Sequence, residues 1–249
     1  MKISVVTAVF NRRETVAHAI ESLQAQTYSS YEHVVQDGGS SDGTLDVIAG
    51  LSDENTSLVS EADAGIYDAI NKGIQRAEGD VIGLMHSDDF FASDQVLENI
   101  AQAFEDRSVD GVYGDLQYVS SEDPGKTVRH WRAGTFHPKR LRQGWMPPHP
   151  TLYLRRDVFE RLGLYDTSFR IAADYDAMLR YFAQGGIRTA YIPEVLVKMR
   201  VGGVSNRSLR HIVRKSREDY RAIRRNDIGG LSTLMLKNFS KIGQFIVKD

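Results

Sequence analysis

The 249-residue sequence contains no cysteine and has only six prolines and two tryptophans. The absence of cysteine excludes disulfides, thiolate zinc sites, iron–sulfur clusters and cysteine nucleophiles. Long apolar runs are also missing, because no stretch approaches the roughly 18 uncharged apolar residues of a membrane-spanning helix. The first apolar run ends at Arg12, so we expect neither a signal peptide nor a transmembrane segment. These absences favour a protein of the cytoplasm.

The net charge of −2 hides an uneven distribution along the chain. Residues 1–123 contain 6 Lys and Arg against 23 Asp and Glu, whereas residues 124–249 contain 25 against 10. The two halves therefore carry −17 and +15, which average composition does not produce. Either the halves attract each other within one compact domain, or the acidic half binds cations and the basic half binds an anion.

The first half of the chain alternates between strand and helix patterns. Apolar, β-branched runs predict five strands, at Ile3–Val9, His33–Gln36, Ser57–Ser60, Val81–Met85 and Gly111–Tyr113. Helical spacing of apolar residues predicts four helices between them, at Glu14–Gln24 with Asn11 as its cap, Thr44–Ala49, Ala64–Ala77 and from Ser93 to Phe104. Strands that alternate with helices of this length predict parallel βαβ units and an α/β fold.

The pattern changes after about residue 114. Asp115–Ser120 and Thr127–Trp131 predict a β-hairpin, helices are predicted at Asp157–Leu162 and Asp174–Ala183, and Thr189–Ile192 predicts another strand. The last part of the chain is different again, with two amphipathic helical stripes separated by a break at 227–230. The second stripe contains Leu231, Met235, Phe239, Ile242 and Ile246.

Polar residues follow several of the predicted strands, at positions where the carboxyl ends of parallel strands meet and ligands bind. Asp88 and Asp89 come directly after one such strand. Two adjacent carboxylates repel each other unless a divalent cation such as Mg²⁺ or Mn²⁺ lies between them, and the alternative is a simple helix cap. The Gly-rich loop that begins at Asp37 is not a P-loop, because it lacks the Gly-Lys-Ser/Thr ending.

Five segments make the sequence recognisable. They occur in the order VVTAVFNR, VVQDGGSSDGT, SEADAGIYDAINKGIQRAEGDVIGLMHSDD, HPTLYLRRDVFERLGLYD and IAADYDAMLR. Together they resemble the family 2 glycosyltransferases, and among these the bacterial enzymes of surface-polysaccharide assembly of the colanic acid type. The resemblance implies the GT-A fold, which is a Rossmann-like, mixed and mostly parallel sheet flanked by helices. It also implies inverting, metal-dependent transfer of a sugar from a nucleotide sugar. Of the two donor classes, we expect UDP-sugars rather than GDP-sugars.

The resemblance covers roughly residues 1–205, which we expect to form the catalytic domain, with nucleotide-binding residues 1–114 and acceptor-binding residues 115–205. Residues 206–249 would then be a basic helical tail. In the family, residues after the first two strands bind the nucleotide, and further positions lie near the nucleoside and diphosphate. These positions correspond here to Thr7, Ala8, Asn11, Asp37, Asp63 and Ser87.

The metal and catalytic positions of the family also have counterparts, with departures. The metal motif corresponds to His86-Ser87-Asp88, so that Asp88, followed by Asp89, would bind Mg²⁺ or Mn²⁺ while His86 replaces an Asp. The general base corresponds to Asp174, for which a helix cap is the alternative. The loop at 199–205 lacks the family's His, and its Gly202 and Gly203 could act as hinges for closure over the donor.

Residues around the expected acceptor site have less specific signals. His149 can bind a hydroxyl or a phosphate, and Arg200 is expected near the acceptor or diphosphate. Trp145 could stack on a sugar, but packing beneath its loop explains it equally well. His18 and His33 are expected at the surface.

The basic tail has more than one explanation. It could lie on an anionic membrane at the inner face of the plasma membrane, pack on the catalytic domain, or pair with a second copy as a homodimer. No nucleic-acid readout motif accompanies it.

The expected partners are a nucleotide-sugar donor and a saccharide or polyprenyl-diphosphate-linked acceptor. A non-catalytic nucleotide-sugar-binding homologue is the main alternative function. A nucleotidyltransferase would need a basic Gly-rich loop in place of Thr7–Phe10.

Overall fold

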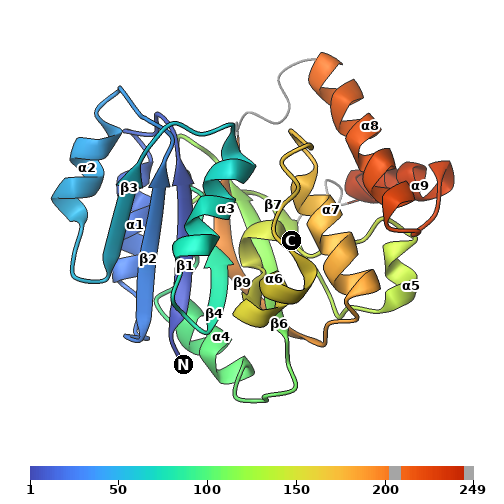
Figure 1. Cartoon of the computed structure of the whole chain (residues 1–249), viewed down its shortest axis with the longest axis horizontal. Helices are drawn as coiled ribbons and strands as arrows, with labels where there is room; N and C mark the ends of the chain where they lie inside the picture. Colours follow the sequence, from blue (N-terminus) through green and yellow to red (C-terminus); the bar gives the residue numbers. More distant parts are fainter. Residues whose placement is uncertain (202–208, 244–249) are drawn as a thin grey trace.

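The computed structural model describes residues 1–201 and 209–243, and its centre is one nine-stranded sheet (Figure 1). The strands are β1 (Ile3–Val9), β2 (Tyr31–Asp37), β3 (Thr56–Ser60), β4 (Val81–Leu84), β5 (Asp89–Phe91), β6 (Gly111–Val119), β7 (Thr127–Trp131), β8 (Tyr153–Arg155) and β9 (Thr189–Arg200). Their order is β3-β2-β1-β4-β8-β6-β9-β5, and β7 pairs with β6. β1 to β4 pair in parallel, as do β6 and β9, whereas β5, β7 and β8 pair antiparallel. The predicted mixed, mostly parallel α/β sheet is therefore confirmed.

Helices cover both faces of the sheet, as the alternating pattern predicts. They are α1 (Val16–Gln24), α2 (Thr44–Leu51), α3 (Ile66–Arg76), α4 (Val96–Ala103), α5 (Pro138–Leu141), α6 (Arg156–Leu162), α7 (Ala173–Leu179), α8 (Leu209–Arg225) and α9 (Leu231–Gly243), with a 3₁₀ turn η1 (His149–Thr151) and a π-helical turn η2 (Arg180–Gln184). α1, α2 and α4 pack on one face, and α3, α6 and α7 on the other. Every residue of β1 and β2 is buried, because these strands are covered on both sides.

Several predicted details are wrong in an informative way. Asn11 does not cap α1, which begins at Val16. The φ of Asn11 is +50°, and the Asn11 side chain instead accepts a hydrogen bond from Ser41 N at 2.9 Å. The short strand β5 was not predicted at all, because its partner is the distant end of β9. That end was missed too, since β9 extends the predicted strand to Arg200.

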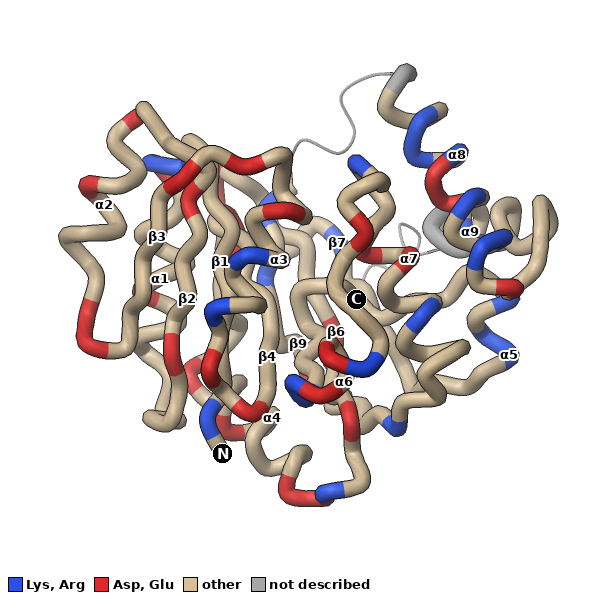
Figure 2. The backbone as a smooth tube through the Cα atoms, in the orientation of Figure 1, with Lys and Arg blue, Asp and Glu red and all other residues tan. Residues whose placement is uncertain are grey.

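The C-terminal helices pack beside α7, on the side of the molecule away from β3 (Figure 1). Basic residues recur along α8, in agreement with the positive charge of this part of the chain (Figure 2). The apolar residues Leu231, Met235, Leu236 and Phe239 of α9 are exposed, while Lys237 is buried. The side of α9 that packs on the protein includes the buried Thr233 and Lys237 beside the partly buried Leu234, while the other apolar side chains named above face away from the protein. Ile246 lies outside the described residues, and the side chain of Ile242 is not described.

Within residues 1–201 and 209–243, no helix combines the length and the hydrophobicity that a membrane crossing requires. Of the predicted closing loop, Gly202 and Gly203 lie outside the described residues.

Candidate active site

The loops that follow β1 and β2 are joined at the carboxyl edge of the sheet. Asn11 N donates to Ser40 Oγ at 2.8 Å, and Arg12 N donates to Thr44 Oγ1 at 2.8 Å. With the Asn11–Ser41 bond, these contacts tie the two loops into one unit. The sequence predicts that these loops meet, and the structure confirms it.

Asp37 organises the Gly-rich loop from within. Its carboxylate accepts hydrogen bonds from the amides of Gly39 and Ser40, both at 2.9 Å, and from Ser60 Oγ at 2.6 Å. Burial raises the pKa of Asp37, but the hydrogen bonds from Ser40, Ser60 and Gly39 outweigh burial and hold that pKa below its usual value. The residue is fully buried, so its carboxylate stabilises the loop through these hydrogen bonds and is not exposed to a ligand.

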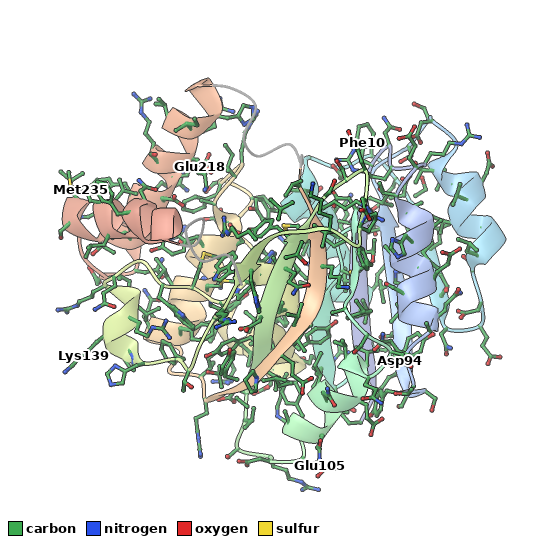
Figure 3. The ribbon with its side chains drawn as sticks, turned by 180° about the vertical axis from the view of Figure 1, so that it is seen from behind. Phe10, Asp94, Glu105, Lys139, Glu218 and Met235 are labelled. Atoms are coloured by element: carbon green, nitrogen blue, oxygen red, sulfur yellow. The ribbon has the colours of Figure 1, made fainter. Side chains whose placement is uncertain are left out.

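An acidic and an aromatic side chain flank the glycine after Asp37. A β-carbon on Gly38 would lie 2.4 Å from Asp63 Oδ2 and 3.4 Å from a ring carbon of Phe10, so a larger residue here would displace the Asp63 carboxylate. The ring of Phe10 is 56% exposed and lies at the outer end of its loop (Figure 3). A carboxylate can accept a bond from a ribose hydroxyl or a base N–H, and an exposed ring can stack on a base. Phe10 was not among the predicted site residues, although an apolar side chain directly after a buried strand was a signal.

Thr7 and Ala8 form part of the buried floor beneath these loops. The Thr7 hydroxyl is bonded to His33 Nε2 at 2.9 Å, and both side chains are buried. Burial lowers the pKa of His33 to about 4, so His33 is neutral at pH 7. The expectation that His33 is a surface residue is therefore wrong. Contact between Thr7 and a ligand would have to use its main chain.

The loop after β4 presents Asp88 and turns Asp89 inward. Asp89 begins β5 and is 1% exposed, and neither of its carboxylate oxygens has a hydrogen-bond partner in the part of the chain that the structure describes. Burial, and next the charge of Asp88, raise the pKa of Asp89 well above its usual value. Asp88 lies in the turn before β5 and is partly exposed, whereas the carboxylate of Asp89 is buried, so Asp88 is the more accessible of the two predicted metal ligands.

Arg200 supports this loop from β9. Its Nη1 donates to the main-chain oxygen of Asp88 at 2.7 Å, its Nη2 contacts His18 Nδ1 at 2.5 Å, and the guanidinium lies over the ring of Phe90. Ser87 is buried in the same loop. The predicted site residues Ser87, Asp88 and Arg200 are thus brought together.

A divalent metal fits Asp88 but finds no complete set of protein ligands. Among residues 1–201 and 209–243, no three His, Asp or Glu side chains gather so that they could hold an ion. The Asp88 carboxylate makes no hydrogen bond or ion pair with another described residue, so it is available as a hard oxygen ligand. Mg²⁺ and Mn²⁺ accept such sites, because substrate phosphates and water complete their coordination.

A chain of rings connects the Asp88 loop with Asp174 at the start of α7. Tyr67 OH donates to the Ile171 carbonyl at 2.7 Å and lies 3.2 Å from Asp174 Oδ1. The Tyr67 ring stacks on Tyr165, whose hydroxyl is bonded to His149 Nε2 at 2.9 Å. The ring centroids of His149 and His86 are 5.7 Å apart. The structure therefore brings the predicted residues Asp174 and His149 to one site, and it adds Tyr67 and Tyr165.

The electrostatics of the two histidines agree with this arrangement. Burial lowers the pKa of His86, while the charges of Asp88 and Asp174 act on it in the opposite direction. Burial lowers the pKa of His149 to about 4, again against the charge of Asp174. His149 is therefore a neutral ring at pH 7, and its bond to Tyr165 orients it.

Trp145 lies in an aromatic cluster, as the packing interpretation expects. It stacks on Phe136 and meets Tyr113 and Phe182 edge to face, and its indole N–H donates to the Ala133 carbonyl at 2.8 Å. The Trp145 ring is partly buried, and its indole N–H, which is its one hydrogen-bond donor, is already bonded within the protein.

Comparison with known proteins agrees with this geometry. Residues 4–163 match the family described as Glycosyl transferase family 2. The chain belongs to this family. A PGL/p-HBAD biosynthesis glycosyltransferase of Mycobacterium tuberculosis is 30% identical over 208 residues, which cover 82% of this chain and 78% of the relative. The protein is therefore a glycosyltransferase.

Solved structures of glycosyltransferases share the fold. S. aureus TarS in complex with UDP-GlcNAc has a TM-score of 0.70 at 16% identity, with 91% of this chain and 65% of that chain covered. The mannosyltransferase PcManGT from Pyrobaculum calidifontis, in complex with GDP-Man and Mn²⁺, has a TM-score of 0.68 at 18% identity, with 96% and 68% covered. The family 2 glycosyltransferase described above thus has the GT-A fold of these proteins.

Proposed function

We propose that this family 2 glycosyltransferase inverts configuration as it transfers a sugar from a nucleoside-diphosphate sugar to a hydroxyl of a saccharide acceptor. The observation that carries this proposal is the connected set of contacts between the Asp88 loop and Asp174. The carboxylate of Asp88 is available to bind a metal at the diphosphate. The carboxylate of Asp174, at the other end of the chain of rings, is available to accept a proton.

The donor would bind on the loops after β1 and β2. Phe10 would stack on the base, while Asp63 and Asn11 would meet its polar edge or the ribose. We propose UDP in preference to GDP. TarS binds UDP-GlcNAc and PcManGT binds GDP-Man, so both donor classes are compatible with the fold and must be compared directly.

Asp88 would hold the divalent metal, which supplies positive charge to the departing diphosphate. Asp174 accepts the proton of the acceptor hydroxyl, whose oxygen forms a bond to the anomeric carbon as the bond to the diphosphate breaks. Attack from the side opposite the leaving group inverts the anomeric centre. Neutral His149 and Tyr165 would orient the sugar or diphosphate by hydrogen bonds, and Arg200 would keep the Asp88 loop in place.

The acceptor would be a glycan or a lipid-linked saccharide at the inner face of the plasma membrane. Support comes from α9, whose exposed Leu231, Met235 and Phe239 lie next to the arginine-rich α8. Apolar side chains beside arginines are typical of helices that bind anionic membrane surfaces. Full-length protein should co-sediment with phosphatidylglycerol vesicles, and the variant Met235→Ser/Phe239→Ser should not. Binding by the variant, or dimerisation without vesicle binding, would contradict this part of the proposal.

A turnover assay tests the reaction itself. Sugar transfer and donor hydrolysis are measured with UDP- and GDP-sugars, with and without saccharide acceptors, in Mn²⁺ or in chelator. We expect transfer that chelator abolishes, and metal-dependent binding of the nucleotide that Asp88→Ala removes. A non-catalytic homologue would bind the donor without turnover, and a nucleotidyltransferase would make the sugar nucleotide from sugar phosphate.

A further inference from the structure

Glu218 of α8 binds the turn that leads into the helix of Asp174. One oxygen of its carboxylate accepts hydrogen bonds from the amides of Ile171 at 2.8 Å and Ala172 at 3.1 Å. Ala172 is the residue before α7, and no side chain of its own segment caps that helix. Glu218 lies on the side of α8 that is turned toward the body of the molecule (Figure 3). A residue 44 positions along the chain from Asp174 thus supplies the missing acceptor.

The residues after Asp174 are held by α9 and by Asn226, the residue that follows α8. Asn226 Nδ2 donates to Asp176 Oδ1 at 3.0 Å. Lys237 of α9 pairs with Asp219 of α8 at 2.6 Å, both side chains being 3% exposed, and its ammonium lies 3.2 Å from the ring centroid of Tyr175. The base is therefore flanked on both sides by residues that α8 or α9 contacts.

The opposite wall of the site touches α9 as well. Gly144 has a φ of +79°, and a β-carbon on it would lie 2.3 Å from Lys237 Cβ and 2.4 Å from Lys237 Cα. This close approach places α9 against the loop that carries Trp145 and continues toward His149. The C-terminal helices thus contact both segments that border the acceptor side.

We propose that α8 and α9 position the acceptor side of the active site, and that Glu218 is the positioning residue for Asp174. The proposal rests on the proposed role of Asp174 as general base. Without the carboxylate, two amides of a partly buried turn lose their acceptor, and the turn would relax. A shift of about 1 Å in a catalytic group can cost about 100-fold in rate. In the described part of the chain, the hydrogen bonds of Glu218 go to the turn before α7 and not to the donor loops, so binding of the nucleotide should be spared.

The test compares Glu218→Ala and Glu218→Gln in the full chain, with Glu105→Ala as the matched control. Glu105 is an exposed glutamate at the far end of the molecule, beyond α4 (Figure 3). Amide hydrogen exchange is followed in the peptide that covers residues 169–176. In parallel, kcat, the KM for the donor and the affinity for the nucleotide are measured.

In Glu218→Ala we expect exchange in this peptide to rise about tenfold or more, and kcat to fall roughly 10- to 100-fold with donor KM within about twofold of wild type. Glu218→Gln keeps an oxygen acceptor and should recover most of the loss, and Glu105→Ala should behave as wild type. Unchanged amide exchange in Glu218→Ala would show that Glu218 does not stabilise this turn. Faster exchange with normal kcat, or equal losses in kcat and nucleotide affinity, would overturn the positioning of Asp174.

The exchange measurement does not depend on turnover. If the wild-type protein transferred no sugar, the proposed function would fail, whereas the exchange of residues 169–176 would still support or overturn the contact between Glu218 and this turn.

Discussion

The donor side and the acceptor side of this active site are built in different ways. On the donor side, the loops after β1 and β2 bind each other over short stretches of chain, and Asp37 is satisfied by Gly39, Ser40 and Ser60. On the acceptor side, Asp174 meets Tyr67 from α3, and the turn before it depends on Glu218 from α8. The donor loops are therefore held by residues between β1 and β3, while the acceptor side combines α3, α7 and α8, which are far apart in the sequence.

The charges of the two regions also differ in how they are used. The acidic half contains Asp37 and Asp89, which are buried, and Asp88, whose carboxylate has no hydrogen-bond or ion-pair partner among residues 1–201 and 209–243. Many of its other carboxylates lie on exposed helices and loops (Figure 2). The excess negative charge is thus only in part a property of the site. In the basic half, by contrast, Lys237 is buried in an internal ion pair, and Arg200 supports the Asp88 loop.

The largest effect on activity should come from Asp174→Asn, which should affect the acceptor side and leave the donor side intact. Removing a general base costs about 10²- to 10⁴-fold in rate, so we expect roughly a 10³-fold loss of kcat with unchanged affinity for the nucleotide. Asp157→Asn on the exposed face of α6 is the control. Calorimetric titration with UDP and a transfer assay check both values, and normal turnover in Asp174→Asn would refute the assignment.

A change to the ion pair of the C-terminal helices should destabilise the acceptor side. Lys237→Met leaves the buried carboxylate of Asp219 without its cation, which typically costs about 3–5 kcal/mol. Lys237→Met/Asp219→Leu removes both charges and should recover most of this loss. Urea unfolding measures the free energies, with Asn238→Ala on the exposed face of α9 as control. A double variant as unstable as the single one would show that the pair is not the cause.

The buried histidine under the donor loops should make stability depend on pH. Burial lowers the pKa of His33 from 6.5 to about 4, so the unfolded chain binds the proton more tightly than the folded protein. This contribution to stability is complete above pH 6.5 and is lost as the pH falls toward and through 4, by about 3 kcal/mol at pH 4. Unfolding free energies of His33→Gln should fall less steeply in this window. Parallel curves for variant and wild type would contradict the assignment.

The smallest effect concerns the donor side alone. Phe10→Ala removes the proposed stacking surface, and loss of one base–aromatic stack is worth about 1–3 kcal/mol, or about 5- to 150-fold in nucleotide affinity. Because the ring is 56% exposed, the free energy of unfolding should hardly change. Phe10→Tyr should keep the affinity, and Val128→Ala, also exposed, serves as control. Unchanged affinity in Phe10→Ala would place the base elsewhere.

Much of the fold was predictable, because its signals are local. The β-branched runs of β1 and β4 and the helical stripes of α1 and α3 are periodic patterns that a buried sheet and its covering helices impose on neighbouring residues. The predictions failed where a distant partner decides the outcome. β5 pairs with the distant end of β9, and His33 is buried because β2 is covered on both faces of the sheet.

The site shows the same division. The sequence alone determined the family, the α/β sheet and the candidates Asp88 and Asp174, because each stands in a short segment whose residue types already state a chemistry. The tertiary structure decided that Asp89 points inward, that Tyr67 and Tyr165 connect Asp174 with His149, and that Glu218 binds the turn before the base. These facts depend on which side chains meet across tens of residues. Only the packing of helices on the sheet determines that, because no local pattern of residues encodes it.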